Sequence, residues 1–205
     1  MGDRERYAAR ALGGHRVNTE ATPLRGRQVY LVPFVEKHVE DPDYFKWLTD
    51  ADVYRYIGRD EYFQQLELEE LRRYAAEMWA NPFVTFFAVY ATDTDRFIGT
   101  AKVNFTHEHF RQSGIADLGI MIGERGYWGK GLSIDILRTI SIHAFDDLGA
   151  RKLTAGAFSL NVPVIKAFLR LGFKQDACLR EQLAAADGYC DHILLSCFEH
   201  ELVRA

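Results

Sequence analysis

The sequence predicts one α+β domain built around a mixed β-sheet. Strand-like and helix-like stretches alternate along the chain in the order β-α-α-β-β-β-α-β-α-β-β. The 205 residues, 48% of them hydrophobic, are enough to enclose one buried core. No internal repeat and no low-complexity segment interrupts this order. We therefore expect a single α/β mixed sheet flanked by helices.

The amino-terminal segment differs in composition from the rest of the chain. Residues 1–27 hold six arginines against three acidic residues, and their apolar residues follow no helical or strand period. We expect residues 1–27 to form a loosely ordered arm. Residues 28–205 are expected to form the single domain.

The first half of the domain predicts one strand and two helices. Residues 28–35 are rich in β-branched and aromatic side chains, as a strand requires. Asp41 and Pro42 suit an N-cap and a first helical position, so we expect a helix over 43–50. A second helix is expected over 66–79, where acidic residues come first and apolar residues recur with a helical period.

The middle of the chain predicts a hairpin and one further strand. Residues 84–91 and 97–105 are β-rich runs separated by Thr-Asp-Thr-Asp, which is typical of a hairpin turn. A third run follows at residues 115–122. Gly119 lies inside this run, where a β-bulge would open the strand.

The last part of the chain alternates helices and strands. Glycines at positions 149 and 172 suit the ends of two amphipathic helices. The expected elements are a helix over 132–148, a strand over 152–158, a helix over 161–171, and two strands over 173–179 and 189–198 joined by a turn at Asp187-Gly188.

Composition excludes several classes of protein. The net charge of −4 and the pI near 6.0 give no electrostatic case for nucleic acid. No apolar run reaches the roughly 20 residues of a membrane helix, and the first 30 residues lack the apolar core of a signal peptide. Cys178, Cys190 and Cys197 lack metal-ligand spacing and predict reduced thiols in the cytoplasm. No other His, Cys or Asp cluster predicts a metal site.

A glycine-rich turn stands out between residues 125 and 133, in the stretch RGYWGKGLS. Glycine is favoured where φ is positive or where a ligand approaches the main chain closely. A strand, a glycine turn and a helix in succession expose main-chain N–H groups at the positive end of the helix dipole. The stretch therefore predicts an anion site.

Two common phosphate-binding patterns do not fit this turn. A P-loop requires Ser or Thr after its lysine, but Lys130 is followed by Gly131. A dinucleotide fingerprint that starts at Gly129 requires a third glycine where Ile134 stands. A helix start that merely needs small residues is the remaining alternative.

The turn from Gly126 to Gly131 resembles the [Gln/Arg]-x-x-Gly-x-Gly/Ala turn of the Gcn5-related N-acetyltransferases (GNAT superfamily). Residues 161–173 resemble the Asn-x-x-[Ala/Ser]…Leu-Gly-Phe segment of that family, and the likeness runs from Val29 to Val203. The opening residues 29–58 look like the branch that holds ribosomal-protein N-terminal acetyltransferases and enzymes that acetylate nucleotide-linked amino sugars.

The resemblance implies a GNAT-like acyl-CoA N-acyltransferase fold, with a mostly antiparallel central sheet flanked by helices. It implies an acetyltransferase that moves the acetyl group of acetyl-CoA to a primary amine by direct attack in a ternary complex. The implied pantetheine contacts are Ile120, Met121 and Ile122, one of whose N–H groups would also stabilise the oxyanion. The implied contacts elsewhere on CoA are Arg125, Gly126, Trp128, Gly129, Lys130, Gly131, Leu132, Asn161, Lys166 and Phe168.

Some of the implied CoA contacts could instead have a purely structural role, and one departs from the family pattern. Arg125 would supply the charge that the family has at the position of Gly126. Trp128 would either flank the cofactor or cover the helix end, and Asn161 would either bind CoA or cap its helix. Lys166 would meet the 3′-phosphate or face solvent.

The general base has three candidates: His107, His109 and Asp117. An imidazole, with an ordinary pKa of about 6.5, matches an amine better than a carboxyl group at about 3.9. We therefore place His107 or His109 ahead of Asp117, although both histidines also suit an exposed loop. The family often has a tyrosine acid where Phe168 stands, and Val164 replaces its usual Ser or Ala, so no side-chain acid is expected for the departing thiolate.

The acceptor is expected over the first helices and the last hairpin. Tyr54, Arg55 and Tyr56 suit stacking on a base or a sugar. We expect a small amine, with a nucleotide-linked amino sugar as one candidate. The alternatives are a protein α-amine and a non-catalytic acyl-CoA-binding protein, and a homodimer is a possible assembly.

Overall fold

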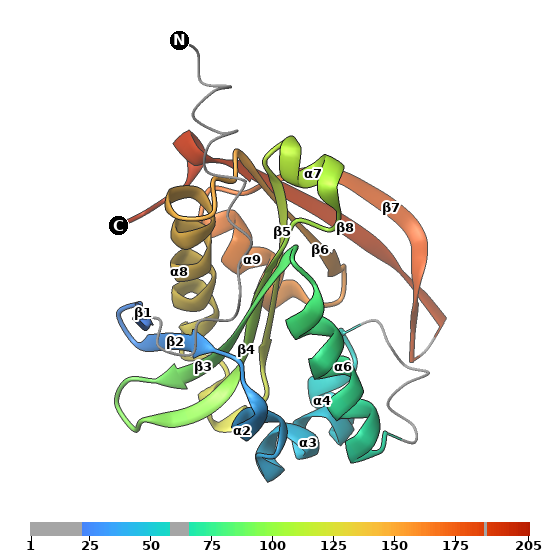
Figure 1. Cartoon of the computed structure of the whole chain (residues 1–205). Helices are drawn as coiled ribbons and strands as arrows, with labels where there is room; N and C mark the ends of the chain where they lie inside the picture. Colours follow the sequence, from blue (N-terminus) through green and yellow to red (C-terminus); the bar gives the residue numbers. More distant parts are fainter. Residues whose placement is uncertain (1–21, 58–65, 187) are drawn as a thin grey trace.

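The structure is a computed structural model that describes residues 22–57, 66–186 and 188–205 (Figure 1). Its strands form one sheet in the order β1-β2-β3-β4-β5-β6-β8-β7. All neighbouring strands are antiparallel except β5 and β6. The strands are β1 (Leu24–Arg25), β2 (Val29–Pro33), β3 (Val84–Ala91), β4 (Arg96–Asn104), β5 (Ile115–Ile122), β6 (Lys152–Phe158), β7 (Lys174–Ala185) and β8 (Gly188–Phe198).

Helices cover both faces of this sheet, so the predicted α+β class is confirmed. One buried cluster joins the sheet to α8 and α9, and a second joins it to the group of α2, α3, α4 and α6 (Figure 1). The α-helices are α2 (Glu36–Val39), α3 (Pro42–Thr49), α4 (Ala51–Tyr54), α6 (Leu68–Ala80), α7 (Glu108–Gln112), α8 (Leu132–Asp146) and α9 (Val162–Arg170). Two 3₁₀ turns are η1 (Arg125–Tyr127) and η2 (Glu199–Glu201).

Local sequence signals explain the long elements. The Asp41 side chain accepts a hydrogen bond from the N–H of Asp43 at 2.9 Å, which caps α3 as its sequence predicts. Gly149 and Gly172 have φ of 72° and 95°, and they follow the ends of α8 and α9. The short helices α2, α4 and α7 were not predicted, because one turn of helix contains no complete apolar period.

The amino-terminal boundary is a correction to the sequence prediction. Residues 1–21 of the expected arm lie outside the described residues. Leu24 and Arg25, however, pair with Leu31 and Tyr30 and form the first strand of the sheet. The ordered domain therefore begins before residue 28.

A buried carboxylate on α8 holds this amino-terminal hairpin. Asp135 Oδ2 accepts hydrogen bonds from the N–H groups of Gln28, at 2.7 Å, and Val29, at 3.2 Å. A Cβ on Gly26 would lie 2.6 Å from the same oxygen, so only glycine fits there. The hairpin is thus attached to the helix that begins at the glycine-rich turn.

The last hairpin is longer than predicted, since β7 continues to Ala185 with irregular register after Leu179. Asp187 of the predicted turn lies outside the described residues. Among the described helices, none is long and apolar enough to cross a membrane. The described part of the chain also holds no cluster of His, Cys, Asp or Glu side chains suited to a metal ion.

Candidate active site

The site lies where two parallel strands separate. β5 pairs with β6 only from Ile115 to Asp117, opposite Lys152 to Thr154. β5 then continues to Ile122 without β6 as its neighbour, and β6 continues to Phe158. The edge of β5 that faces β6 is therefore available to a ligand over its second half.

The separation does not come from a bulge at Gly119. The pairing of β5 with β4 is regular from Asp117 to Ile122, which corrects the sequence expectation. Gly119 has another role, because a Cβ there would lie 2.9 Å from Cε of Lys102. The missing side chain lets Lys102 lie across β5.

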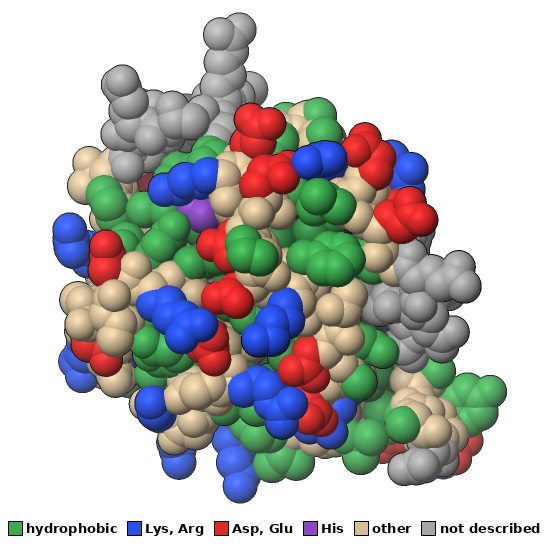
Figure 2. Space-filling model, turned by 90° about the horizontal axis from the view of Figure 1, so that it is seen from below, with side chains coloured by type: hydrophobic (Ala, Val, Ile, Leu, Met, Phe, Trp, Pro, Cys, Tyr) green, Lys and Arg blue, Asp and Glu red, His purple; other side chains and the backbone are tan. Residues whose placement is uncertain are grey.

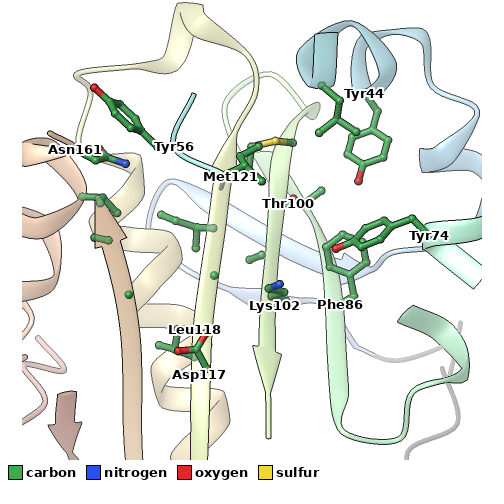
Figure 3. Close-up of a pocket in the computed structure, with 18 of the residues that line it drawn as sticks. Tyr44, Tyr56, Tyr74, Phe86, Thr100, Lys102, Asp117, Leu118, Met121 and Asn161 are labelled. Carbon is green, nitrogen blue, oxygen red and sulfur yellow. The ribbon is translucent and has the colours of Figure 1, made fainter. Parts of the chain in front are cut away.

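A cavity of about 450 Å³ opens at this separation (Figure 3). Its floor comes from β4, β5 and β6, and its walls come from α3, α6, α9 and the segment after α4. Aromatic side chains dominate one side, where Tyr44 and Tyr74 lie near Phe86 (Figure 3). Glu70, Arg73 and Glu77 on α6 add charge to the wall.

Asp117 lies in the floor of this cavity, where β5 and β6 part (Figure 3). Its Oδ2 accepts a hydrogen bond from Thr154 Oγ1 at 3.1 Å. Burial raises the pKa of Asp117 to about 6, although Thr154 and the Lys102 ammonium act in the opposite direction. A carboxylate with this pKa is ionised at neutral pH and is a better proton acceptor than an ordinary aspartate.

His107 and His109 lie elsewhere. His107 is the N-cap of α7 and His109 lies in that helix, and both side chains are exposed. Neither lines the cavity, whereas Asp117 does. Of the three candidate bases, Asp117 is therefore the one that the structure places in the cavity.

The glycine-rich turn has the geometry of an anion cradle. Gly129 and Gly131 have φ of 73° and 81°, a conformation that side chains with a Cβ rarely adopt. A Cβ on either residue would meet nothing within 4 Å, so their outer faces are open. Gly131 is the N-cap of α8, whose first N–H groups, including that of Leu132, have no partner within the helix. The chain can therefore hold a pyrophosphate with its main chain.

Two side chains next to the turn, those of Arg125 and Trp128, already interact with other residues of the protein. Arg125 forms ion pairs with Asp52 at 2.8 Å and Asp50 at 3.4 Å, and its guanidinium lies 5.5 Å from the Trp128 ring centroid. Trp128 Nε1 donates a hydrogen bond to the Ile122 carbonyl at 2.8 Å. Acidic and basic side chains are interspersed on the face that Figure 2 shows. The charge expected from Arg125 is thus already paired with aspartates.

Lys130 and Gly126 occupy the rim of the turn. Lys130 is exposed, and its Nζ lies 5.1 Å from the Tyr127 ring centroid. Gly126 N donates to Glu124 Oε1 at 3.3 Å, which caps η1.

The expected pantetheine contacts divide into two groups. Ile120 and Met121 line the cavity together with Asn161, whose side chain makes no capping hydrogen bond. Ile122 does not line it, and its carbonyl is taken by Trp128. Lys166 is exposed on α9 outside the lining.

Phe168 lines the cavity as a buried ring packed against Phe173, with ring centroids 4.8 Å apart. It brings no hydroxyl group to the gap between β5 and β6.

Of the three residues expected at the acceptor, only Tyr56 reaches the cavity. Arg55 is exposed, forms an ion pair with Asp52 at 3.5 Å and lies 5.2 Å from the Tyr56 ring centroid. Tyr54 does not line the cavity either. Sequence reasoning also missed Lys102 and Tyr74, because neither belongs to a recognisable motif and long-range packing alone brings them here.

The separated strands, the cavity between them and the open glycine-rich turn are the features expected of an acyl-CoA-dependent transferase, and a comparison with protein families agrees. Residues 28–174 match the family model described as an acetyltransferase (GNAT) domain. The chain belongs to this family, which makes it an acetyl-CoA-dependent acyltransferase and confirms the resemblance stated above.

Individual relatives support the same class. The chain is 27% identical to the human alpha/beta-tubulin-N-acetyltransferase 9 over 169 residues, which span 76% of this chain and 77% of that protein. RimJ of Mycobacterium smegmatis, solved with CoA-disulfide, superposes with a TM-score of 0.74 at 16% identity and covers 90% of this chain and 89% of its own.

Spermidine N-acetyltransferase of Vibrio cholerae, solved with CoA and spermine, superposes with a TM-score of 0.72 at 15% identity. The superposition covers 85% of this chain and 97% of that one. These two structures establish the fold alone.

Proposed function

We propose that this protein transfers the acetyl group of acetyl-CoA to a primary amine by direct attack within a ternary complex. The observation that carries the proposal is the position of Asp117. Its carboxylate lies at the point where β5 and β6 separate, inside a cavity whose floor includes the free edge of β5. The open glycine-rich turn lies just beyond the end of the same strand.

The donor would be held by main-chain groups. The N–H groups around Gly129, Gly131 and Leu132 meet the pyrophosphate, where the dipole of α8 favours negative charge. The free edge of β5 near Ile120 and Met121 takes the pantetheine. When bound, acetyl-CoA supplies the activated acyl group.

The chemistry requires one proton acceptor and one oxyanion donor. Asp117 takes the proton that the amine loses, directly or through one water molecule. An N–H group of the Ile120–Ile122 stretch stabilises the carbonyl oxygen as it gains charge, an effect worth about 3 kcal/mol in comparable sites. The hydrogen bond from Thr154 and, to a smaller extent, the charge of Lys102 lower the pKa of Asp117 and so oppose the effect of burial.

For the acceptor we propose a protein α-amine ahead of a small amine. The support is the name of the human relative, an alpha/beta-tubulin-N-acetyltransferase, which indicates that this relative acts on a protein. In addition, Arg55 and Tyr54 do not line the cavity, so the stacking trio expected for a nucleotide is not assembled. A small amine, including a nucleotide-linked amino sugar, is the second candidate. The free thiols of the three cysteines support a cytoplasmic location, which we also propose.

The test measures release of CoA from acetyl-CoA with three amine probes. The probes are a peptide with the amino-terminal sequence of tubulin and a free α-amine, spermidine, and a UDP-linked amino sugar. The same peptide with a blocked amine is the matched control. Mass spectrometry of the product should show one added acetyl group on the free peptide and none on the blocked one.

Donor binding is tested separately by calorimetric titration with acetyl-CoA. Replacing Gly131 with Glu places a carboxylate at the open cradle and should abolish binding, while circular dichroism shows the fold retained. Wild-type protein that binds acetyl-CoA but acetylates none of the probes would contradict the proposed acceptors. Wild-type protein that does not bind acetyl-CoA would contradict the proposed function itself.

A further inference from the structure

Lys102 brings a positive charge into the floor of the cavity, and the mechanism given above assigns it no contact with either substrate. It lies on β4, opposite Phe86 of β3 and Gly119 of β5. Its side chain is directed over Gly119, because Cγ and Cε lie 3.3 Å and 2.9 Å from the position that a Cβ on that glycine would take. The ammonium group, one bond beyond Cε, therefore lies beside β5.

Lys102 and Asp117 are diagonal neighbours on the face that lines the cavity. Lys102 pairs with Gly119 across the two strands, and Asp117 pairs with Asn104. Residues two apart on a strand point to the same face, and diagonal neighbours lie about 7 to 8 Å apart, within reach of a long side chain. Figure 3 shows both side chains on the cavity floor, and the Lys102 charge lowers the pKa of Asp117. The floor therefore presents a proton acceptor and a hydrogen-bond donor at neighbouring positions.

The other charged side chains of the cavity lie on its α6 wall. Among the lining residues that the structure describes, these are Glu70, Arg73 and Glu77. Arg73 forms an ion pair with Glu70 at 3.8 Å, and Glu77 is exposed. Lys102 is half-buried, and its charge acts on Asp117. Any ligand group beside Asp117 is therefore in the field of this lysine.

A peptide amino terminus carries two polar groups that match this pair. Three bonds separate its amine nitrogen from the oxygen of its first carbonyl group. In the proposed reaction the amine gives up a proton to Asp117, whereas the carbonyl oxygen only accepts hydrogen bonds. An ammonium group has three N–H donors, so Lys102 can retain a contact within the protein while it meets this oxygen. An amine on an alkyl chain offers no such oxygen.

We propose that the Lys102 ammonium donates a hydrogen bond to the carbonyl oxygen next to the reacting amine, so that the site selects α-amines over amines on alkyl chains. This inference rests on the proposed function, because it places the reacting amine at Asp117. A free α-amino acid presents the same two groups, with a carboxylate oxygen in place of the carbonyl oxygen. The acceptor is thus an α-amino acyl compound, and we take a peptide amino terminus as its source.

The charge of Lys102 favours the same class of acceptor. Attack requires the uncharged amine, and a neighbouring cation makes the charged form less favourable. An α-amine has an ordinary pKa of about 7.7 to 8.0, whereas a lysine-type amine has a pKa of about 10.4. Near pH 8 about half of the α-amines are already uncharged, so the cation costs them little. A polyamine also brings a further ammonium group, which Lys102 repels.

The first test compares acceptors in the wild type and in Lys102→Met, which keeps an unbranched apolar stem over Gly119. The acceptors are the free-amine tubulin peptide, free alanine and butylamine. At pH 8 the variant should lower kcat/KM for the peptide about tenfold to a hundredfold, because a hydrogen bond from a charged donor is lost. The value for butylamine should not fall. The variant also raises the pKa of Asp117, but this change acts on every amine alike, so the ratio of peptide to butylamine removes it.

Two further variants serve as comparisons. Lys46→Met removes an exposed lysine of α3 that does not line the cavity, and the ratio should not change. Gly119→Ala keeps the charge of Lys102 but brings a methyl group to 2.9 Å from its Cε, so it displaces the end of the side chain and should lower the ratio. An unchanged ratio in Lys102→Met, or an equal loss with peptide and butylamine, would overturn the proposal. Turnover of alanine in place of the peptide, with the same sensitivity to Lys102→Met, would support it and identify a free amino acid as the acceptor.

The second test needs no turnover. Protein saturated with CoA is titrated calorimetrically with the free-amine peptide and with alanine. Lys102→Met should weaken binding of the acceptor about tenfold or more, whereas Lys46→Met should not. Equal binding by Lys102→Met and the wild type, or a wild type that binds neither probe, would overturn the inference. If binding depends on Lys102 but no amine is acetylated, the proposed function fails while the contact of Lys102 with the acceptor stands.

Discussion

Replacing Asp117 with Asn should stabilise the folded protein at pH 8 while it removes most of the activity. Burial raises the pKa of this carboxyl group from 3.8 to about 6 in the folded state. Between these two values the folded protein retains a proton that the unfolded chain has released. Stability therefore falls as pH rises from about 4 to 6, and the deficit at pH 8 is up to about 3 kcal/mol.

Asparagine removes this deficit because it carries no charge at any pH. Its side-chain oxygen can still accept the hydrogen bond that Thr154 now donates at 3.1 Å. The lost attraction of Lys102 offsets part of the gain. We therefore expect the variant to be about 1 to 3 kcal/mol more stable at pH 8 and about equally stable near pH 4.

Urea unfolding followed by circular dichroism at pH 4, 6 and 8 measures this difference for both proteins. Release of CoA in the presence of the amine should fall by about a hundredfold or more, as is typical when a general base is removed. Asp176→Asn is the control. The Lys152 ammonium lowers the pKa of that exposed carboxyl group, so its replacement should decrease the stability at pH 8 instead of increasing it. Equal stability of the Asp117 variant and the wild type across this range would refute the reasoning about burial.

Three further predictions concern pH and backbone geometry. Thr154→Val removes a hydrogen bond that lowers the pKa of Asp117, so the acidic limb of kcat/KM should move to higher pH in a pH–rate profile. Burial lowers the pKa of His38 from 6.5 to about 4, so up to about 3 kcal/mol of stability should be lost as pH falls between these values; urea unfolding should show a flatter profile for His38→Phe. Gly131→Ala should cost about 1 kcal/mol because φ is 81°, whereas Gly126→Ala, whose Cβ meets only an ordinary contact at 3.5 Å, should change the thermal midpoint little.

The elements with strong local signals were predictable from the sequence. The 132–148 stretch has an apolar period and a terminal glycine, and the structure places α8 at Leu132–Asp146. The glycine pattern likewise indicated either positive φ or a close ligand approach in the turn, and Gly129 and Gly131 do have positive φ. These properties depend on neighbouring residues, so a single sequence contains them.

The evidence that favours one candidate base over the others comes from contacts between distant segments. Asp117, already a candidate from its position in the sequence, is favoured by its burial beside Thr154 where β5 and β6 separate, and the register of two parallel strands sets this position. His107 and His109 are attractive as imidazoles, but their position on a one-turn helix has no periodic signal that the sequence could reveal. Residue type favours the two histidines, whereas position in the cavity favours Asp117.

Side-chain pairing also escaped prediction at the donor site. Arg125 is adjacent to the glycines, and proximity in sequence suggested that it binds phosphate. In the fold its guanidinium reaches Asp50 and Asp52, which lie more than 70 residues earlier in the chain. No local pattern predicts such a partner.

The contact between Asp135 and the first hairpin has a practical consequence for shortening this protein. The family match begins at residue 28, which would be a natural place to cut. A chain that started at Gln28 would lose β1 and would bring a charged amino terminus to the buried Asp135 carboxylate, where a neutral N–H now lies at 2.7 Å. An expression boundary at residue 22 keeps the strand, the Gly26 turn and the helix that begins the donor site as one unit.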